Sequence, residues 1–143
     1  MYVSDILKSK GNDVVSIAPD ASVTAALALL CEKKIGAALV LNEDGSIAGI
    51  LSERDLVHAL HRFQEKFIEK RVSDLMTTEV VTCSPRDPVT GIMGMMTAHR
   101  FRHVPVIDHG KLVGVISIGD VVKSRIAEAE SEVEALRQYI TAT

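Results

Sequence analysis

The chain has few aromatic side chains and no excess of positive charge. Its 143 residues include no Trp, two Tyr and three Phe, and its formal net charge at pH 7 is −3. Nucleic-acid binding needs clustered basic charge, and binding to single strands also needs aromatic platforms on which bases stack. The composition therefore argues against a nucleic-acid partner and predicts an aliphatic core.

Cysteine and long apolar runs are also scarce. The two cysteines, Cys31 and Cys83, follow no signal-like N-terminus, so we expect reduced core thiols in a cytoplasmic protein, with a disulfide between them as the much less favoured alternative. No uninterrupted apolar run approaches the roughly 18 residues of a membrane-spanning helix. We therefore expect no membrane segment.

Motifs of catalysis and metal binding are missing as well. The chain contains neither a Walker-type phosphate loop nor a GxGxxG segment after a strand. His58 and His61 lie three residues apart but have no carboxylate or Cys at metal-ligand spacing, so we expect both at the surface. The sequence predicts a protein that is not an enzyme and holds no metal.

What the chain does contain is an internal repeat. The offset between the copies is 66 residues from position 80 to position 106 and 65 residues from position 110 onward, and it is 69 residues in the segments that lead into the copies. The matched pairs are Val14/Val80, Val15/Val81, Pro19/Pro85, Val23/Val89, Thr24/Thr90, Val40/Val106, Gly45/Gly110, Gly49/Gly114, Ser52/Ser117 and Asp55/Asp120. The lead-ins also match, because Val-Ser-Asp occurs at residues 3–5 and again at 72–74. Two copies are too few for a solenoid, so we expect a pseudo-twofold pair.

Each copy predicts a strand, a helix, two more strands and a second helix. The predicted strands are residues 14–17, 37–41 and 47–51 in the first copy, and 80–83, 103–107 and 112–116 in the second. The first helix of the second copy is expected to start with Asp87 as its cap and Pro88 as its first residue. In the first copy either Asp20 or Ser22 could be the cap.

The last helix differs from its counterpart because it carries a coiled-coil-like seam. The apolar residues are spaced alternately by four and three positions: Val122, Ile126, Ala129, Val133, Leu136 and Ile140. We expect part of this seam to cover the chain's own core and the rest to contribute to a homodimer interface.

Two matched segments place a hydroxyl at the junction of a strand and a helix and a carboxylate three residues later. They are Gly-Ile-Leu-Ser-Glu-Arg-Asp at residues 49–55 and Gly-Val-Ile-Ser-Ile-Gly-Asp at residues 114–120. A helix start attracts phosphate, and an Asp beside it can accept hydrogen bonds from both hydroxyls of a ribose. The same pattern is also a capping box, which needs no ligand. Both interpretations stay open at this point.

Taken together, these motifs resemble a tandem pair of cystathionine-β-synthase (CBS) domains, a Bateman module. The resemblance rests on the Val-Val-x-x-x-Pro openings, on His-Val-Pro-Val at residues 103–106 and on the two Ser-x-x-Asp endings, and it covers the chain from Val3 to the final helix. It implies an α/β (α+β) fold of two β-α-β-β-α repeats packed with pseudo-twofold symmetry. Residues 1–68 would form the first repeat, and residues 69–143 the second repeat with its long C-terminal helix.

The resemblance also implies two clefts that bind adenosine-containing ligands, each combining the Ser-x-x-Asp of one repeat with strands of the other. One cleft would take Ser117 and Asp120 with Ser16, Ile17, Gly36 and Ala37. The other would take Ser52, Arg54 and Asp55 with Thr82, Cys83, Val104 and Pro105.

Basic residues break the symmetry of the copies. Arg102 and His103 of the second copy, where family members place phosphate-binding side chains, replace Gly36 and Ala37 of the first. We therefore expect the clefts to differ in affinity. A basic stretch at residues 8–11, Lys-Ser-Lys-Gly, could reach a phosphate, but a helix end stopped by Gly11 explains it better.

The sequence thus predicts a non-catalytic regulatory module that senses energy or redox state by binding AMP, ADP, ATP or NAD(H), and that acts on a separate, unidentified protein. Three alternatives remain. They are a structural dimerisation module with degenerate clefts, an S-adenosylmethionine sensor, and an oxidoreductase-related protein that uses NAD(H), for which no catalytic residue is found.

Overall fold

The computed structural model describes residues 1–142, and the chain forms two compact units. The middle unit comprises residues 14–80, and the split unit comprises residues 1–13 together with the chain from Val81 onward. The expected division between sequence repeats after residue 68 is a different boundary and remains a prediction.

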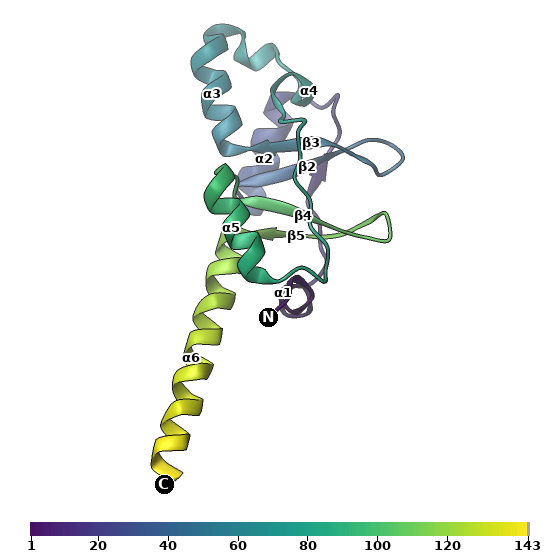
Figure 1. The fold of residues 1–143 in the computed structure, drawn as a ribbon. Coiled ribbons are helices and arrows are strands. Elements are labelled where there is room, and N and C mark those ends of the chain that lie inside the picture. Colours follow the sequence, from purple (N-terminus) through teal and green to yellow (C-terminus); the bar gives the residue numbers. More distant parts are fainter. Residues whose placement is uncertain (143) are drawn as a thin grey trace. The chain divides into compact units, whose positions relative to one another are not determined.

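The middle unit is built on a three-stranded sheet with the order β1-β2-β3. β1 pairs parallel with β2, and β3 pairs antiparallel with β2 (Figure 1). The elements are β1 (Ser16–Ile17), α2 (Val23–Lys33), β2 (Ala37–Leu41), β3 (Ile47–Ser52), α3 (Glu53–Phe63), the 3₁₀ segment η1 (Gln64–Glu69) and α4 (Val72–Leu75). Ser22 is the N-cap of α2, since its Oγ accepts a hydrogen bond from the Ala25 N–H at 3.1 Å.

The core of the middle unit joins one face of α2 and the sheet with residues of α3, η1 and α4. Val23, Ala26 and Leu30 follow helical spacing and are buried in one cluster with Val40 and Leu51. The consecutive buried residues of β2 fit a strand covered on both faces.

The split unit repeats this plan with a two-stranded sheet. Its elements are α1 (Val3–Lys10), α5 (Val89–His99), β4 (His103–Asp108), β5 (Lys111–Ser117) and α6 (Ile118–Ala142). β4 and β5 pair antiparallel as a hairpin, as expected. The core joins α1, α5, β4, β5 and the start of α6 through Val3, Ile92, Val106, Ile116 and Val121.

Each lead-in docks on the turn before the first helix of its unit. In the split unit the N–H groups of Val3 and Ser4 donate to the carbonyls of Asp87 and Pro85, both at 2.9 Å. In the middle unit Val72 and Ser73 donate in the same way to Ala21 and Pro19, again at 2.9 Å. The first lead-in therefore completes the second copy, and the second lead-in completes the first copy.

The expected strand at residues 80–83 is wrong in extent, because only Cys83 forms a bridge, with Val106. The cause is Pro105. In the middle unit the corresponding residue, Leu39, donates its N–H to Val15 O at 3.1 Å. Proline has no N–H to donate, so the second copy loses this ladder bond.

The expected cap at Asp87 is also wrong. Pro88 is the N-cap of α5, which begins at Val89 without a side-chain cap. The Asp87 carboxylate instead accepts the Ser84 N–H at 2.8 Å and closes the preceding turn.

The seam of α6 does not cover the unit's own core, contrary to expectation. Val121 and Ser124 are the buried residues of this helix, whereas Val122 is 48% and Ile126 54% exposed. The face that packs inward is therefore displaced from the seam.

Candidate functional site

In each unit a strand runs directly into a helix at the Ser of the Ser-x-x-Asp motif. Ser52 ends β3 and lies opposite Ala37, and Ser117 ends β5 and lies opposite His103. The next residue then turns back to the neighbouring strand, since Glu53 N donates to Gly36 O at 2.9 Å and Ile118 N to Arg102 O at 2.8 Å. The motif therefore lies at the sheet edge where β2 or β4 begins.

Both motifs form the same capping box. The backbone N–H and the Oγ–H of Ser52 donate to Asp55 Oδ2 at 2.9 and 3.0 Å, and Asp55 N–H donates back to Ser52 Oγ at 3.2 Å. Ser117 and Asp120 repeat these bonds at 2.8, 3.0 and 3.2 Å. The capping role is therefore real in both copies. It fixes each carboxylate through Oδ2 and leaves Oδ1 facing away from the box.

The second oxygen of Asp55 has a neutral partner. The Thr77 hydroxyl, which follows α4 in the second lead-in, donates to Asp55 Oδ1 at 3.2 Å. The backbone of Thr77 also pairs with β3, because its N–H and carbonyl each bond to Ile50 at 2.9 Å. The lead-in thus adds a single-residue bridge beside β3 and a hydroxyl to the site of the middle unit.

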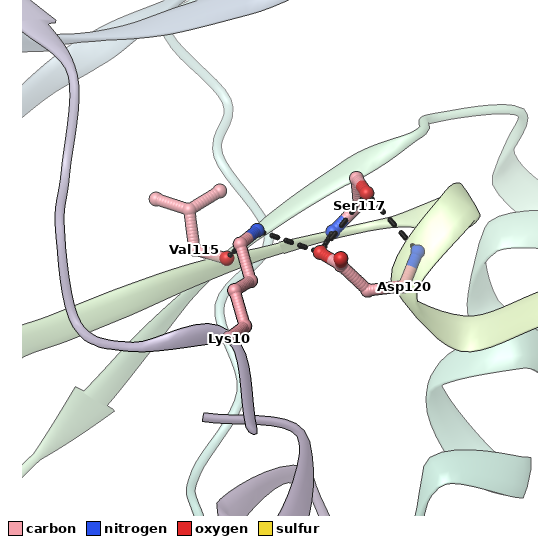
Figure 2. Close-up of polar contacts among 4 residues, drawn as sticks. All are labelled: Lys10, Val115, Ser117 and Asp120. Atoms are coloured by element: carbon pink, nitrogen blue, oxygen red, sulfur yellow. Dashed lines mark hydrogen bonds and ion pairs between the residues drawn. The ribbon is translucent and has the colours of Figure 1, made fainter. Parts of the chain in front are cut away.

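In the split unit the partner of the carboxylate is a lysine, and it contacts Oδ2, the oxygen that also belongs to the capping box (Figure 2). Lys10 Nζ, at the end of α1, donates to Asp120 Oδ2 at 2.6 Å and to the carbonyl of Val115 at 2.7 Å. Val115 corresponds to Ile50 in the repeat, so one ammonium group makes both the strand contact and the carboxylate contact that Thr77 makes elsewhere. Among the described residues, Asp120 Oδ1 accepts no hydrogen bond.

The ionisation of Asp120 follows from these contacts. Burial alone would raise the pKa of its carboxyl, but hydrogen bonds from Lys10 and Ser117 and the charge of Lys10 outweigh burial, so the pKa lies below its ordinary value. Asp120 is therefore a carboxylate at neutral pH, with one oxygen held by an ammonium and the other open to a hydrogen-bond donor.

The pKa of Cys83 is shifted in the opposite direction to that of Asp120, so its side chain stays uncharged. Its side chain is buried in the core of the split unit, and burial with the nearby Asp87 charge raises the pKa of the thiol to about 12. The thiol is protonated at neutral pH and is a poor nucleophile. Its backbone is engaged too, since its N–H donates to Pro105 O at 3.0 Å. Cys31, in contrast, is exposed on α2, so the expectation that both cysteines lie in the core is wrong for Cys31.

The structure brings together only part of the predicted set within each unit. Gly36 and Ala37 adjoin Ser52 and Asp55, and Arg102 and His103 adjoin Ser117 and Asp120. The predicted strand residues lie in the sheets of their own units. In the middle unit Ser16 and Ile17 pair with β2. In the split unit Cys83 bridges β4, Val104 and Pro105 are buried in β4, and Thr82 is exposed just before Cys83. Arg54 is exposed in the first turn of α3. The ligand contacts assigned to these residues, and their pairing across the repeats, stay predictions.

Two residues of the site were missed as carboxylate partners. Lys10 was considered only for a phosphate or a helix end, and Gly11 does end α1, with a φ of 94°. Thr77 was not singled out, and nothing in its sequence context marks it. Lys10 carried a partial signal, because the basic residues of the first lead-in have no match in the second.

Within residues 1–142 the structure offers neither a metal-binding cluster nor a membrane-spanning helix. No group of three or more His, Cys, Asp or Glu residues in that range is arranged to hold a metal ion. No helix there is long and apolar enough to cross a membrane. His58 and His61 are exposed on α3, as expected.

Comparison with known proteins matches this architecture. The family model described as "CBS domain" matches the chain twice, at residues 3–62 and 72–127. The crystal structure of the CBS-domain protein ATU1752 from Agrobacterium tumefaciens is 46% identical, with a TM-score of 0.85 over 87% of this chain and 99% of that one. The mitochondrial CBS-domain protein CBSX3 of Arabidopsis thaliana is 33% identical over 96% of this chain and 71% of its own length. The chain therefore belongs to the CBS-domain family and carries two copies of the domain.

Two further solved structures contain ligands. CBSX2 in complex with AMP is 29% identical, with a TM-score of 0.73 over 90% of this chain and 98% of that one. The CBS domain pair of MJ0100, in complex with 5′-methylthioadenosine and S-adenosyl-L-methionine, is 26% identical, with a TM-score of 0.76 over 91% and 98% of the two chains. Both complexes hold an adenosine group.

Proposed function

We propose that this chain is a non-catalytic regulatory module that binds an adenine nucleotide through the carboxylates of its two Ser-x-x-Asp motifs. The observation that carries the proposal is the geometry of Asp120, whose Oδ2 is held by Ser117 and Lys10 while Oδ1 accepts no bond from the described residues. A ribose has two adjacent hydroxyls that can donate to such an oxygen. Hydrogen bonds to a charged acceptor contribute roughly 1.5–3 kcal/mol each.

The ligands of the two relatives support an adenosine compound as the ligand class. AMP, 5′-methylthioadenosine and S-adenosylmethionine differ at the 5′ position but share the base and the ribose hydroxyls. A site that recognises the ribose by a carboxylate would accept all three, and groups near the 5′ position would then select among them.

Groups that could select at the 5′ position are basic residues in the split unit. Lys10 reaches Asp120, and Arg102 and His103 adjoin Ser117 at the start of β4. Cations favour a phosphate over a thioether or a sulfonium, so we propose AMP, ADP, ATP or NAD(H) as the ligands of this site. The middle unit has Gly36 and Ala37 at the matching sequence positions, and Thr77, not a lysine, contacts its carboxylate; none of the three carries a charge.

The remaining parts of the proposal concern assembly, location and regulation, and they rest on the sequence. We propose that the protein acts as a homodimer in the cytoplasm, that the two Asp-containing sites differ in affinity, and that the bound nucleotide alters a surface read by a separate protein. A ligand can do this only through different affinities for two conformations.

Two other functions have observations in their favour. An S-adenosylmethionine sensor is favoured by the MJ0100 complex. A purely structural module is favoured by the closed capping boxes and by Lys10, which already neutralises Asp120. The first predicts tighter binding of S-adenosylmethionine than of AMP, and the second predicts binding of neither.

Calorimetric titration of the protein with AMP, ADP, ATP, NADH, 5′-methylthioadenosine and S-adenosylmethionine tests the proposal. We expect a phosphate-containing ligand to bind most tightly and to raise the melting temperature by several degrees, since a ligand at 100 times its Kd stabilises by about 2.7 kcal/mol. Asp120→Asn should weaken one binding event at least tenfold, and Asp55→Asn should weaken the other. No heat and no melting shift with any of the six compounds would reject adenosine sensing in favour of the structural module.

A further inference from the structure

Helix α6 extends well beyond the part of it that packs on its own unit. Of its 25 residues, Val121 and Ser124 are buried, and every residue from Ala129 to Ala142 is exposed. Figure 1 shows these last turns, in yellow, running past β4, β5 and α5 of the same unit. A solitary helical stretch of this length is marginal in water, so its stability calls for another partner.

The exposed stretch carries an apolar seam on a different face from the buried one. Its large residues are between 48% and 63% exposed, namely Val122, Ile126, Val133, Leu136 and Ile140, and the exposed Ala129 completes the series. At about 100° per residue, the seam is centred roughly a third of a turn away from Val121 and Ser124. The seam is therefore available to a partner without disturbing the core.

The order of residues along the seam fits two strands. In heptad notation the a positions are Ile126, Val133 and Ile140, and the d positions are Val122, Ala129 and Leu136. β-Branched residues at a favour two-stranded coiled coils in parallel dimers, particularly with Leu at d, as at Leu136.

Charges beside the seam distinguish the two possible orientations. In a parallel pair each g residue faces the e residue five positions later on the other helix, which sets Arg125 opposite Glu130 and Glu132 opposite Arg137. Each contact occurs twice by symmetry, and all four join opposite charges.

An antiparallel pair with the same overlap would join like charges. Aligning the seam residues in reverse order sets Lys123 near Arg137, and it sets Glu130 and Glu132 each near its own copy. Like charges on facing helices destabilise a pairing and act against the wrong orientation.

We propose that α6 pairs with α6 of a second copy of this chain as a parallel, in-register coiled coil over residues 122–140. Arg125 already bonds Glu128 of its own helix at 2.6 Å. A guanidinium has five N–H donors, so Arg125 can keep this bond and also reach Glu130 of the second copy. The pairing does not depend on nucleotide binding.

Cysteine cross-linking tests the orientation directly. In a Cys31→Ser background, which removes the exposed native thiol, Leu136→Cys should form a disulfide-linked dimer rapidly under mild oxidation. The matched control is Gln138→Cys, which is also exposed but would lie on the outer face of the coiled coil. An antiparallel pair would separate the two residues at position 136 by about 15 Å along the axis. Cross-linking of Leu136→Cys no faster than the control would overturn the proposal.

Sedimentation equilibrium of charge variants gives an independent test, because the two orientations predict opposite changes in the dimer Kd. Glu130→Gln should raise the dimer Kd about two- to fivefold, because it removes two attractive surface pairs. Glu134→Gln, the same change on the outer face, should leave the Kd unchanged. A lower Kd for Glu130→Gln would contradict the parallel orientation, and a monomer at tens of micromolar would contradict the pairing itself.

Discussion

At the scale of single residues, the two copies differ in the residue that donates hydrogen bonds beside the Ser-x-x-Asp motif. The edge of the last strand and the carboxylate beside it need hydrogen-bond donors. Thr77 supplies them with its backbone and hydroxyl, whereas Lys10 supplies them with one ammonium. The difference adds a positive charge to one site alone, and it supports the proposal that the sites bind nucleotides unequally.

The Lys10–Asp120 pair should make stability depend on pH. Because the pKa of Asp120 is lowered in the folded state, the pair stabilises the protein above the carboxyl's unfolded pKa, and that contribution disappears as pH falls through the lower folded pKa. Lys10→Met should therefore reduce the free energy of unfolding at pH 7 by about 1 kcal/mol. Urea unfolding should show the difference between the variants shrinking below pH 4. A constant difference down to pH 2 would show that packing of the Lys10 stem, and not the ion pair, is responsible.

Two equivalent glycines offer a matched test of the lead-in contacts. A Cβ on Gly49 would lie 2.6 Å from the carbonyl oxygen of Thr77, which is backbone. A Cβ on Gly114 would lie 2.7 Å from Leu7 Cδ2, the end of a flexible side chain. Gly49→Ala should therefore cost about 1–3 kcal/mol of stability and Gly114→Ala clearly less, as measured by denaturant unfolding. Equal losses would mean that Leu7 has no room to move.

Sequence predicted the centre of the site but not its surroundings. The repeat identified Ser52, Asp55, Ser117 and Asp120, because matched polar residues at strand ends stand out against apolar neighbours. It did not identify Lys10 as a partner of Asp120, since the two lie 110 positions apart. Lys10 also does not align with Thr77, because the repeat matches Thr77 to Lys8.

At the scale of secondary-structure elements, the lead-ins are exchanged between the copies. α1 buries Val3, Ile6 and Leu7 in the core of the split unit, and α4 buries Val72 in the core of the middle unit. Sequence order could not reveal this exchange, because a short amphipathic helix fits either copy equally well in pattern.

Amide hydrogen exchange can test which core each lead-in completes. Ile6→Ala should cost about 2–5 kcal/mol and should increase exchange mainly in α5, β4 and β5. The equivalent change in the other lead-in, Leu75→Ala, should increase exchange mainly in α2, β2 and β3. If Ile6→Ala affected residues 14–80 more than residues 81–121, the assignment of α1 to the split unit would be wrong.

Helices and hairpins were predicted better than the first strands. Short runs of consecutive apolar residues and the turn residues between them located β2 to β5. The strand at 80–83 was predicted too long, because Pro105 lacks the N–H that would continue its pairing. The prediction that part of the α6 seam covers the core was wrong. The seam is the strongest pattern in the helix, but only the first turns contact the core, and they do so through Val121 and Ser124.

At the scale of the whole molecule, the chain combines a duplicated domain with one unduplicated extension. The duplication supplies two carboxylates at equivalent strand ends, and different lead-ins give them different neighbours. The extension of α6 supplies an exposed seam that the first copy lacks. The proposed ligand binding depends on Asp55 and Asp120 and the proposed self-association on the seam of α6, so the two proposals can be tested separately.

The most direct test of the central claim is a calorimetric cycle that combines AMP or its 2′-deoxy analogue with the wild type or Asp120→Asn. If the carboxylate binds the ribose hydroxyls, the wild type should bind AMP at least tenfold more tightly than 2′-deoxy-AMP, and Asp120→Asn should largely abolish that preference. Equal affinity of the wild type for both compounds, or a preference that survives in Asp120→Asn, would contradict ribose recognition by this aspartate.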